Sequence, residues 1–325
     1  MKRFLLTLYV IGALAIPAVA QFDGPRVYWP LPKNTNIVGA HAIFGTVNAA
    51  LSNWEFAQPS VSIQNNLYML TYTRFQPIFN RTAIWTIALP VGQIKTNASP
   101  VLPGPTSDFV HGVGDPSISG TINLLGASGL KAKEYARYDL STTVAFRVNA
   151  SFPIGQYDES ESSSMGSNQY KVRFSLPVVK ALSAWVPGKK LALDVMPSVI
   201  LFSRNNDFQG QEIEQKPVFT VESHLTRDIT KKAFISFDYS FIRGGEATYI
   251  DKQSGVTVQE TDATNTHLLG MTVNFQINNN MQLFLTHMQT FASEDAPVSL
   301  DGALFKATIS WSWHDVLQGI HDFHD

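Results

Sequence analysis

One stretch of the chain, "LSTTVAFRVNASF" at residues 140–152, constrains the fold more than any other feature. Apart from Thr142, apolar residues occupy every second position from Leu140 to Phe152, and the residues between them are small or polar. In a β-strand, such alternation places the two sets on opposite faces. Strands of globular proteins usually run for about 5–6 residues, whereas this pattern continues for thirteen. Crossing a membrane at a tilt takes about 9–11 residues, so the pattern predicts a strand with one face toward lipid and one toward water.

Similar alternation recurs along the chain and predicts twelve strands in all. It is clearest at 168–179, 190–202, 218–226 and 232–242, and further candidate strands are 37–47, 67–76, 83–93, 116–125, 266–277, 281–290 and 303–313. The connections alternate between long polar loops and short turns, except for 126–139, which has room for one helical turn. Short turns on one side and long loops on the other are typical of even-stranded outer-membrane barrels.

We therefore predict an all-β protein, a transmembrane antiparallel up-and-down β-barrel of about 12 strands that covers residues 36–313. The sheet must close because an open edge in hydrocarbon would leave backbone groups unpaired. A soluble periplasmic β-barrel or sandwich is the alternative, since core-facing strands also alternate. That alternative would have shorter strands and more charges on its outward faces.

The first twenty residues have the layout of a secretory signal peptide. Lys2 and Arg3 precede an apolar run at 4–16, and Ala18-Val19-Ala20 forms a cleavage site of the A-x-A type. We expect export, cleavage near Ala20 and insertion into the outer membrane of a Gram-negative-type cell. Residues 21–35 would then be an N-terminal segment in the periplasm or the lumen, and residues 314–325 a C-terminal tail.

Composition narrows the classes of function. Hydrophobic residues make up 44 % of the chain and charged residues only 15 %, below the ~25 % of soluble domains. Loss of Lys2 and Arg3 would take the formal net charge from −2 to −4, so no basic footprint predicts nucleic-acid binding. The absence of cysteine excludes disulfides and thiolate metal sites. We expect no cofactor and no metal, with outer-membrane lipid and lipopolysaccharide as partners beside an unknown small-molecule solute.

Six charged residues fall on the polar faces of neighbouring strands and are expected to line the interior. They are Arg147, Lys171 and Arg173 from the fifth and sixth strands, and Asp194, Glu222 and Asp238 from the seventh to the ninth. One wall of the lumen would be basic and the neighbouring wall acidic. Opposed walls would set a transverse field that selects polar or zwitterionic solutes. Alternatively, they would form interior ion pairs that close the lumen, and both interpretations stay open.

The second strand adds three more candidates for the lumen. Arg74 is expected to face inward, and Tyr68 and Tyr72 share its phase in the alternation. Two lumenal tyrosines would suit aromatic solutes, although aromatic residues also line interiors for packing alone.

Several short motifs resemble a family of outer-membrane transporters filed under the phenol meta-degradation pathway. They are "YWPLPKNTNIV" (28–38), "GVGDPSISG" (112–120), "ASFPIGQYD" (150–158), "GSNQY" (166–170) and "NNDF" (205–208), in the order that the family shows. The resemblance implies a small outer-membrane barrel that passes small aromatic or apolar compounds. The chain departs from the family in one respect, because twelve residues follow the aromatic last strand "LFKATISWSW".

The sequence thus predicts an outer-membrane channel or transporter for passive uptake or export of small molecules. A structural or adhesive barrel without transport is the first alternative. A barrel that hydrolyses lipids is the second, and it needs a serine, a histidine and an orienting acid on one outer face. Ser223 and His224 are adjacent and so point to opposite faces, while Ser310 and Ser312 lie near His314 with no evident acid. We therefore expect no enzymatic activity.

Overall fold

The computed structural model describes residues 22–51, 60–98, 107–161, 163–293 and 298–314. The predicted signal peptide and the predicted C-terminal tail beyond His314 lie outside these residues. The described strands are β1 (Thr35–Leu51), β2 (Ser60–Ile78), β3 (Arg81–Ala98), β4 (Ser107–Val113), β5 (Ser117–Leu125), β6 (Thr142–Ser151), β7 (Lys171–Ser175), β8 (Val178–Ala181), β9 (Leu191–Phe202), β10 (Asn205–Phe208), β11 (Gln211–Gln215), β12 (Val218–Thr230), β13 (Ala233–Gly244), β14 (Ala247–Asp251), β15 (Thr257–Glu260), β16 (Thr264–Gln276), β17 (Met281–Ser293) and β18 (Val298–His314). A short helix, α2 (Ala132–Tyr135), lies between β5 and β6.

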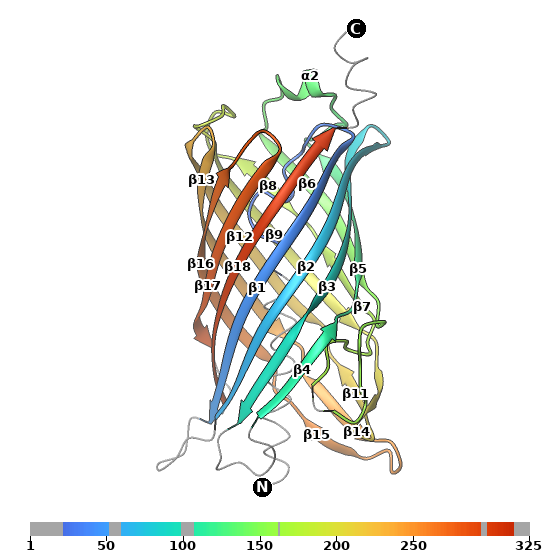
Figure 1. Ribbon diagram of the computed structural model, residues 1–325. Helices are drawn as coiled ribbons and strands as arrows, with labels where there is room; N and C mark the ends of the chain where they lie inside the picture. The colour runs from blue at the N-terminus through green and yellow to red at the C-terminus, as the bar shows by residue number, and fades with distance from the viewer. Residues whose placement is uncertain (1–21, 52–59, 99–106, 162, 294–297, 315–325) are drawn as a thin grey trace.

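In the part of the chain that the structure describes, the strands occupy twelve positions around a closed antiparallel barrel (Figure 1). Two of these positions are each divided into two shorter strands. β4 and β5 both pair with β3, and β7 and β8 both pair with β6 and β9. The barrel closes where β18 pairs with β1, in a register that runs from Thr35 opposite His314 to Leu51 opposite Val298. The prediction of a closed twelve-stranded barrel is confirmed.

The two ends of the barrel differ as the loop lengths predict. Short connections and α2 lie at one end, and the helical turn expected within 126–139 is α2 itself. At the opposite end, strands from two long connections form a second sheet in the order β10-β11-β14-β15 (Figure 1). In outer-membrane barrels the short turns face the periplasm and the long loops face outward. No helix in the described ranges is long and apolar enough to cross a membrane.

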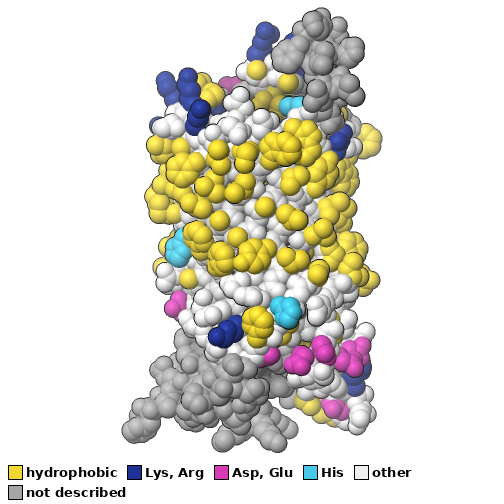
Figure 2. Space-filling model, in the orientation of Figure 1, with side chains coloured by type: hydrophobic (Ala, Val, Ile, Leu, Met, Phe, Trp, Pro, Cys, Tyr) yellow, Lys and Arg dark blue, Asp and Glu magenta, His cyan; other side chains and the backbone are white. Residues whose placement is uncertain are grey.

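The outward face of the barrel carries a broad band of exposed apolar side chains (Figure 2). Among its members are Val38, Phe44, Leu70, Trp85, Ile87, Leu89, Phe146, Phe174, Leu225 and Phe305. Soluble proteins rarely expose contiguous apolar patches larger than a few hundred Å². The alternation in the sequence therefore presents its apolar set to lipid, and the soluble alternative does not fit.

The interior holds the opposite set of side chains together with a segment from the N-terminal side of β1. We call residues 22–34 the lumen segment. At the periplasmic end, the backbone N–H of Asn34 donates to the carbonyl of Phe75, and that of Lys33 donates to the carbonyl of Leu130. From these anchors the lumen segment reaches back into the barrel, and Phe22 packs in a buried apolar cluster with residues of the wall. The segment turns at Gly24, whose φ of +102° suits glycine.

Candidate functional site

The lumen encloses a cavity of about 1110 Å³ between the wall and the lumen segment. Its lining is mixed. Met69, Phe75 and Ile84 contribute apolar surface, while the lumen segment, Arg147 and Lys171 contribute polar groups. Drug-sized ligand sites commonly have about 300–1,000 Å³ and a few placed polar groups among apolar ones. The cavity is thus large enough for a small molecule.

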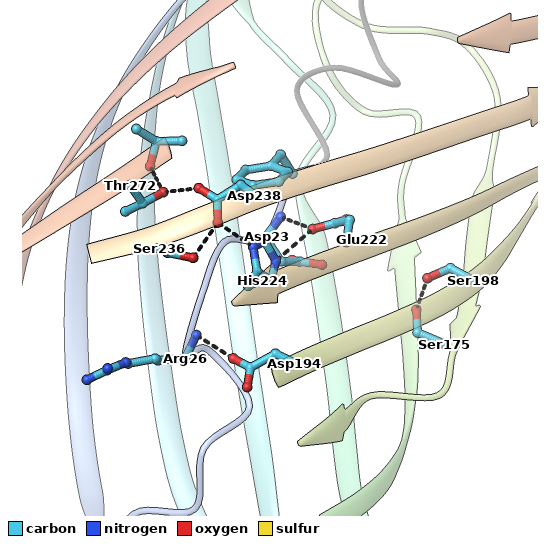
Figure 3. Close-up of polar contacts among 12 residues, drawn as sticks. Asp23, Arg26, Ser175, Asp194, Ser198, Glu222, His224, Ser236, Asp238 and Thr272 are labelled. Carbon is cyan, nitrogen blue, oxygen red and sulfur yellow. Dashed lines mark hydrogen bonds and ion pairs between the residues drawn. The ribbon is translucent and has the colours of Figure 1, made fainter. Parts of the chain in front are cut away.

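Asp23 of the lumen segment occupies the centre of a buried group of charges. Its Oδ2 atom accepts hydrogen bonds from Nη1 of Arg147 at 3.3 Å and from Nη1 of Arg173 at 3.0 Å. The second nitrogen of Arg173, Nη2, donates to Oε1 of Glu222 at 2.7 Å. The other oxygen of Glu222 accepts the backbone N–H of Asp23 at 3.0 Å (Figure 3). Glu222 on β12 and Arg173 on β7 therefore hold Asp23 from two sides.

Lys306 on β18 completes this group. Its Nζ atom donates to the carbonyl of Phe22 at 3.0 Å and lies 3.5 Å from the carbonyl oxygen of Asp23. Burial by itself raises the pKa of the Asp23 carboxyl, but Arg147 and Arg173 outweigh it, so the pKa lies below its ordinary value of 3.8. Asp23 is therefore ionised at neutral pH and acts as the anionic partner of this basic cluster.

A second contact group fixes the part of the lumen segment nearer the periplasm. The carboxylate of Asp194 accepts the indole N–H of Trp29 at 3.0 Å and the backbone N–H of Arg26 at 3.0 Å. The side chain of Arg26 forms an ion pair with Asp228 at 2.8 Å. Its guanidinium also lies between two rings, 4.2 Å from the centre of Trp29 and 3.7 Å from that of Phe234. Such charged and aromatic contacts hold the segment against the wall.

A third group is a hydrogen-bonded chain on the wall itself. Nδ1 of His224 lies 2.8 Å from Oδ1 of Asp238, and that oxygen also accepts the hydroxyl of Ser236 at 2.6 Å (Figure 3). Oδ2 of Asp238 accepts the hydroxyl of Thr272 at 2.5 Å. The side chains of all four residues, His224, Ser236, Asp238 and Thr272, are buried. Phe22 of the lumen segment meets the ring of His224 edge-on at 5.2 Å.

The structure places all six charged residues expected in the lumen on the inner face. Five of them are buried there, namely Arg147, Arg173, Asp194, Glu222 and Asp238, and Lys171 lines the cavity. The pair between Arg173 and Glu222 is one that the ion-pair interpretation predicts. However, Arg147 pairs with Asp23 of the lumen segment, and the backbone N–H of Asp23 donates to Glu222. The lumen segment therefore contacts both the basic and the acidic wall.

The expected inward direction of Tyr68, Tyr72 and Arg74 is wrong. Tyr68 and Tyr72 lie on the outward face with 48 % and 39 % of their surface exposed, and neither lines the cavity. Arg74 has the same phase on β2, and its Nη1 donates to the side-chain oxygen of Asn36, as does the hydroxyl of Tyr72. The lumen residues of this strand have odd numbers, such as Met69 and Thr71. The error arose because both faces of this strand carry polar residues, which leaves the alternation without a clear phase.

Several residues of the site escaped prediction. Lys306 and His224 share the phase of inward residues on their strands, so alternation could have added both. Asp23, Arg26 and Trp29 have no such signal, because they lie before the first strand in a segment without periodicity. The sequence left residues 21–35 in the periplasm or the lumen, and the contacts of Asp23 with Arg147 and Arg173 place the described part of this segment in the lumen.

A closed barrel with lipid-facing apolar residues, polar residues inside and a segment in its lumen is an outer-membrane β-barrel. The chain belongs to the family described as "Putative MetA-pathway of phenol degradation", whose profile matches residues 44–304. The family that the sequence motifs resemble is thereby confirmed.

Solved structures support the same fold. The COG4313 outer membrane channel from Pseudomonas putida F1 has 18 % sequence identity and a TM-score of 0.72, over 90 % of this chain and 100 % of that one. The transport unit of the autotransporter AIDA-I from Escherichia coli has 8 % identity and a TM-score of 0.51, over 95 % and 97 %. The translocator domain of the autotransporter NalP from Neisseria meningitidis has 9 % identity and a TM-score of 0.50, over 94 % and 99 %. No match was found among curated proteins.

Proposed function

We propose that this protein is a passive outer-membrane channel for small molecules, and that aromatic or apolar compounds are among its solutes. The observation that carries the proposal is the cavity of about 1110 Å³ inside a closed, lipid-facing barrel. A barrel with a purely structural role has no need of an interior space of mixed polarity. The P. putida protein of similar fold is an outer membrane channel, which agrees with this proposal.

The lining of the cavity supports small solutes with an apolar body. Met69, Phe75 and Ile84 on one wall would contact an aromatic ring, and backbone and hydroxyl groups nearby would bind its polar substituents. The description of the family, which refers to phenol degradation, points to the same class of compound. Passage needs no cofactor, because diffusion along a concentration gradient supplies the driving force.

The lumen segment is the constriction in this proposal. It lies across the cavity and is held by Arg173 and Glu222 on one side and by Asp194 and Asp228 on the other. A solute must pass beside the segment or wait until the segment moves. Low or intermittent conductance is therefore expected.

Single-channel recording in planar bilayers tests the proposal. We expect discrete conductance steps from the purified protein, and faster entry of phenol into vesicles that contain it than into protein-free vesicles. A protein that inserts into bilayers yet gives neither conductance nor solute entry above that of protein-free vesicles would contradict the channel and favour a structural or adhesive barrel.

A hydrolase is a second candidate because serine, histidine and aspartate lie together at Ser236, His224 and Asp238. In a catalytic triad the serine hydroxyl bonds the imidazole. Here it donates to Asp238 instead, and Ser236 is 0 % exposed. This geometry favours a structural role for the three residues. An assay with short-chain esters and phospholipids tests the point, and turnover that disappears in Ser236→Ala would overturn it.

A further inference from the structure

Two consecutive residues of the lumen segment together have the chemistry of a small aromatic acid. The ring of Phe22 is buried among apolar side chains of the wall, including Ile43, Ile200, Leu268 and Leu304. The carboxylate of the next residue, Asp23, is bound by two guanidinium groups at 3.0 and 3.3 Å. An apolar pocket and a carboxylate site therefore lie side by side, and both are filled by the chain itself.

The charges of the site restrict what could replace these two residues. Arg147, Arg173 and Lys306 supply three positive charges, and among the residues they contact in the described part of the chain, Asp23 and Glu222 supply the negative ones. If Asp23 leaves, buried cations lose their partner, and leaving a buried charge without its partner is costly. A neutral solute in that place would not restore the balance. A solute that carries one negative charge would.

The carboxylate site accepts a planar, singly charged group in particular. One oxygen of Asp23 accepts hydrogen bonds from both arginines. The other terminal nitrogen of Arg173, Nη2, already donates to the carboxylate of Glu222. Guanidinium groups bind carboxylates through directed hydrogen bonds of this kind. A doubly charged group would meet the carboxylate of Glu222 at close range.

We propose that the lumen contains a binding site for amphipathic monocarboxylates, formed by Arg147, Arg173, Lys306 and the apolar cluster around Phe22. In the absence of solute, Phe22 and Asp23 occupy this site. An aryl or alkyl acid competes with them, places its apolar part among the wall residues and its carboxylate on the arginines. This inference rests on the proposed channel function and names a class of solute for it.

The position of the two residues on the lumen segment makes such exchange feasible. The segment is fixed at its other end, where Asn34 and Lys33 bond to the carbonyls of Phe75 and Leu130. Phe22 and Asp23 lie ten or more residues before Lys33, so they can leave the site without releasing these anchors. An internal competitor of this kind lowers the apparent affinity for solute in proportion to the fraction of time that it occupies the site.

Calorimetric titration of the full detergent-solubilised protein tests the proposal, with phenylacetate and its neutral analogue phenylacetamide as probes. The variant Asp23→Asn removes the internal anion with almost no change in shape. If Asp23 occupies the site nine-tenths of the time, this variant binds phenylacetate about tenfold more tightly. Misfolding cannot produce this result, because it is a gain of binding. Adding Arg147→Gln to the Asp23→Asn variant is expected to weaken phenylacetate binding about tenfold, because the acid then loses a guanidinium partner and no internal anion is left to displace. Phenylacetamide, which lacks the negative charge, should bind more weakly than phenylacetate in each protein.

Arg204→Gln is the matched control. Arg204 also forms ion pairs with two glutamates, Glu212 and Glu214, but half of its side chain is exposed outside the lumen. This variant should bind phenylacetate as the unaltered protein does. Equal binding of the acid and the amide, or no gain in Asp23→Asn, would refute the carboxylate site.

Conductance measured on the same preparations separates this inference from the channel proposal. A protein that conducts but does not prefer the acid remains a channel and lacks this site. A protein that binds the acid as described but never conducts has the site and is not a channel.

Discussion

At the scale of single residues, the contact between Asp23 and the two arginines is the feature on which the state of the lumen depends. Asp23 belongs to the lumen segment, which is held by side-chain contacts, whereas Arg147 and Arg173 belong to wall strands that are paired on both sides. The strength of a buried ion pair depends on both partners staying in place. Changing either side therefore alters the charge of the lumen and the position of the segment together.

Reversal of the wall charges should change ion selectivity. In each of the variants Arg147→Glu and Arg173→Glu the lumen loses one positive charge and gains one negative charge, so the preference for anions should fall and cations should permeate severalfold better. The ratio of cation to anion permeability follows from reversal potentials in a salt gradient. Arg204→Glu, outside the lumen, is the control and should keep the original ratio. Unchanged selectivity in the two lumen variants would show that ions do not pass these residues.

The depressed pKa of Asp23 predicts how docking of the lumen segment depends on pH. When the pKa of a carboxyl is lower in the docked state than in the free state, ionisation of that carboxyl stabilises docking. The stabilisation is complete at a pH above the free pKa of about 4. It is lost as the pH falls through the lower pKa of the docked state. Trp29 lies on the same segment and is one of six tryptophans. In a protein whose other five tryptophans are replaced by phenylalanine, quenching of the Trp29 fluorescence by acrylamide therefore reports the docked state.

We expect weak quenching of Trp29 from neutral pH down to about pH 4, and a rise below it. Asp23→Asn removes the titrating group, so this variant should lack that acid transition and show stronger quenching at neutral pH. Release of the segment well above pH 5 in the unaltered protein would contradict the assigned role of Asp23.

At the scale of elements, strands and lumen segment are stabilised in different ways. Each strand is bound to two neighbours by a continuous ladder of backbone hydrogen bonds, as between β1 and β18. The lumen segment has few backbone bonds to the wall and depends on side-chain contacts, above all those of Asp23, Arg26 and Trp29. Elements with few backbone bonds open at lower free-energy cost than strands inside a sheet.

Removal of residues 22–30 should therefore enlarge the pore and leave the barrel intact. We expect a severalfold higher single-channel conductance, with retained resistance of the folded barrel to SDS at room temperature. The double variant Asp23→Asn/Arg26→Gln keeps the backbone and loses two anchors, so it should fluctuate between the two conductance levels. Identical conductance in all three proteins would mean that the segment does not limit the pore.

At the scale of the whole molecule, the barrel is apolar outside and polar inside, the reverse of a soluble protein. This arrangement is stable only where lipid covers the outward band of Figure 2. The protein should require detergent or lipid at every step of purification. A freely soluble monomer without detergent would contradict the fold as a membrane barrel.

An arginine placed in the outward band should destabilise the barrel. Leu89 on β3 is 51 % exposed and lies between outward Ile87 and Val91. Leu89→Arg should lower the free energy of unfolding in lipid vesicles by about 2–4 kcal/mol, as a cation near the bilayer centre does. Ile229→Arg is the control, because Ile229 is 61 % exposed near the periplasmic end of β12 and should lose only about 0–1 kcal/mol. Equal losses for both variants would mean that the band is not buried in lipid.

The alternation of apolar and polar residues along the sequence by itself predicted the number of strands and their closure into a barrel. It also predicted that residues such as Arg147 and Glu222 face inward. The reason is that hydrocarbon tolerates neither unpaired backbone groups nor outward charges, so a strand of this length has one possible orientation. The prediction failed on β2, where polar residues on both faces gave no clear phase, and Tyr68 and Tyr72 point to lipid.

Only the tertiary structure decided what fills the lumen. Nothing in the order of residues 22–34 predicts that Asp23 meets Arg147 and Arg173, which follow it by more than a hundred residues. Such contacts depend on the closure of the barrel, because closure brings β6, β7, β12 and β18 around one segment. A repeating pattern specifies a local direction for each side chain, whereas a non-repeating segment takes its position from the walls that surround it.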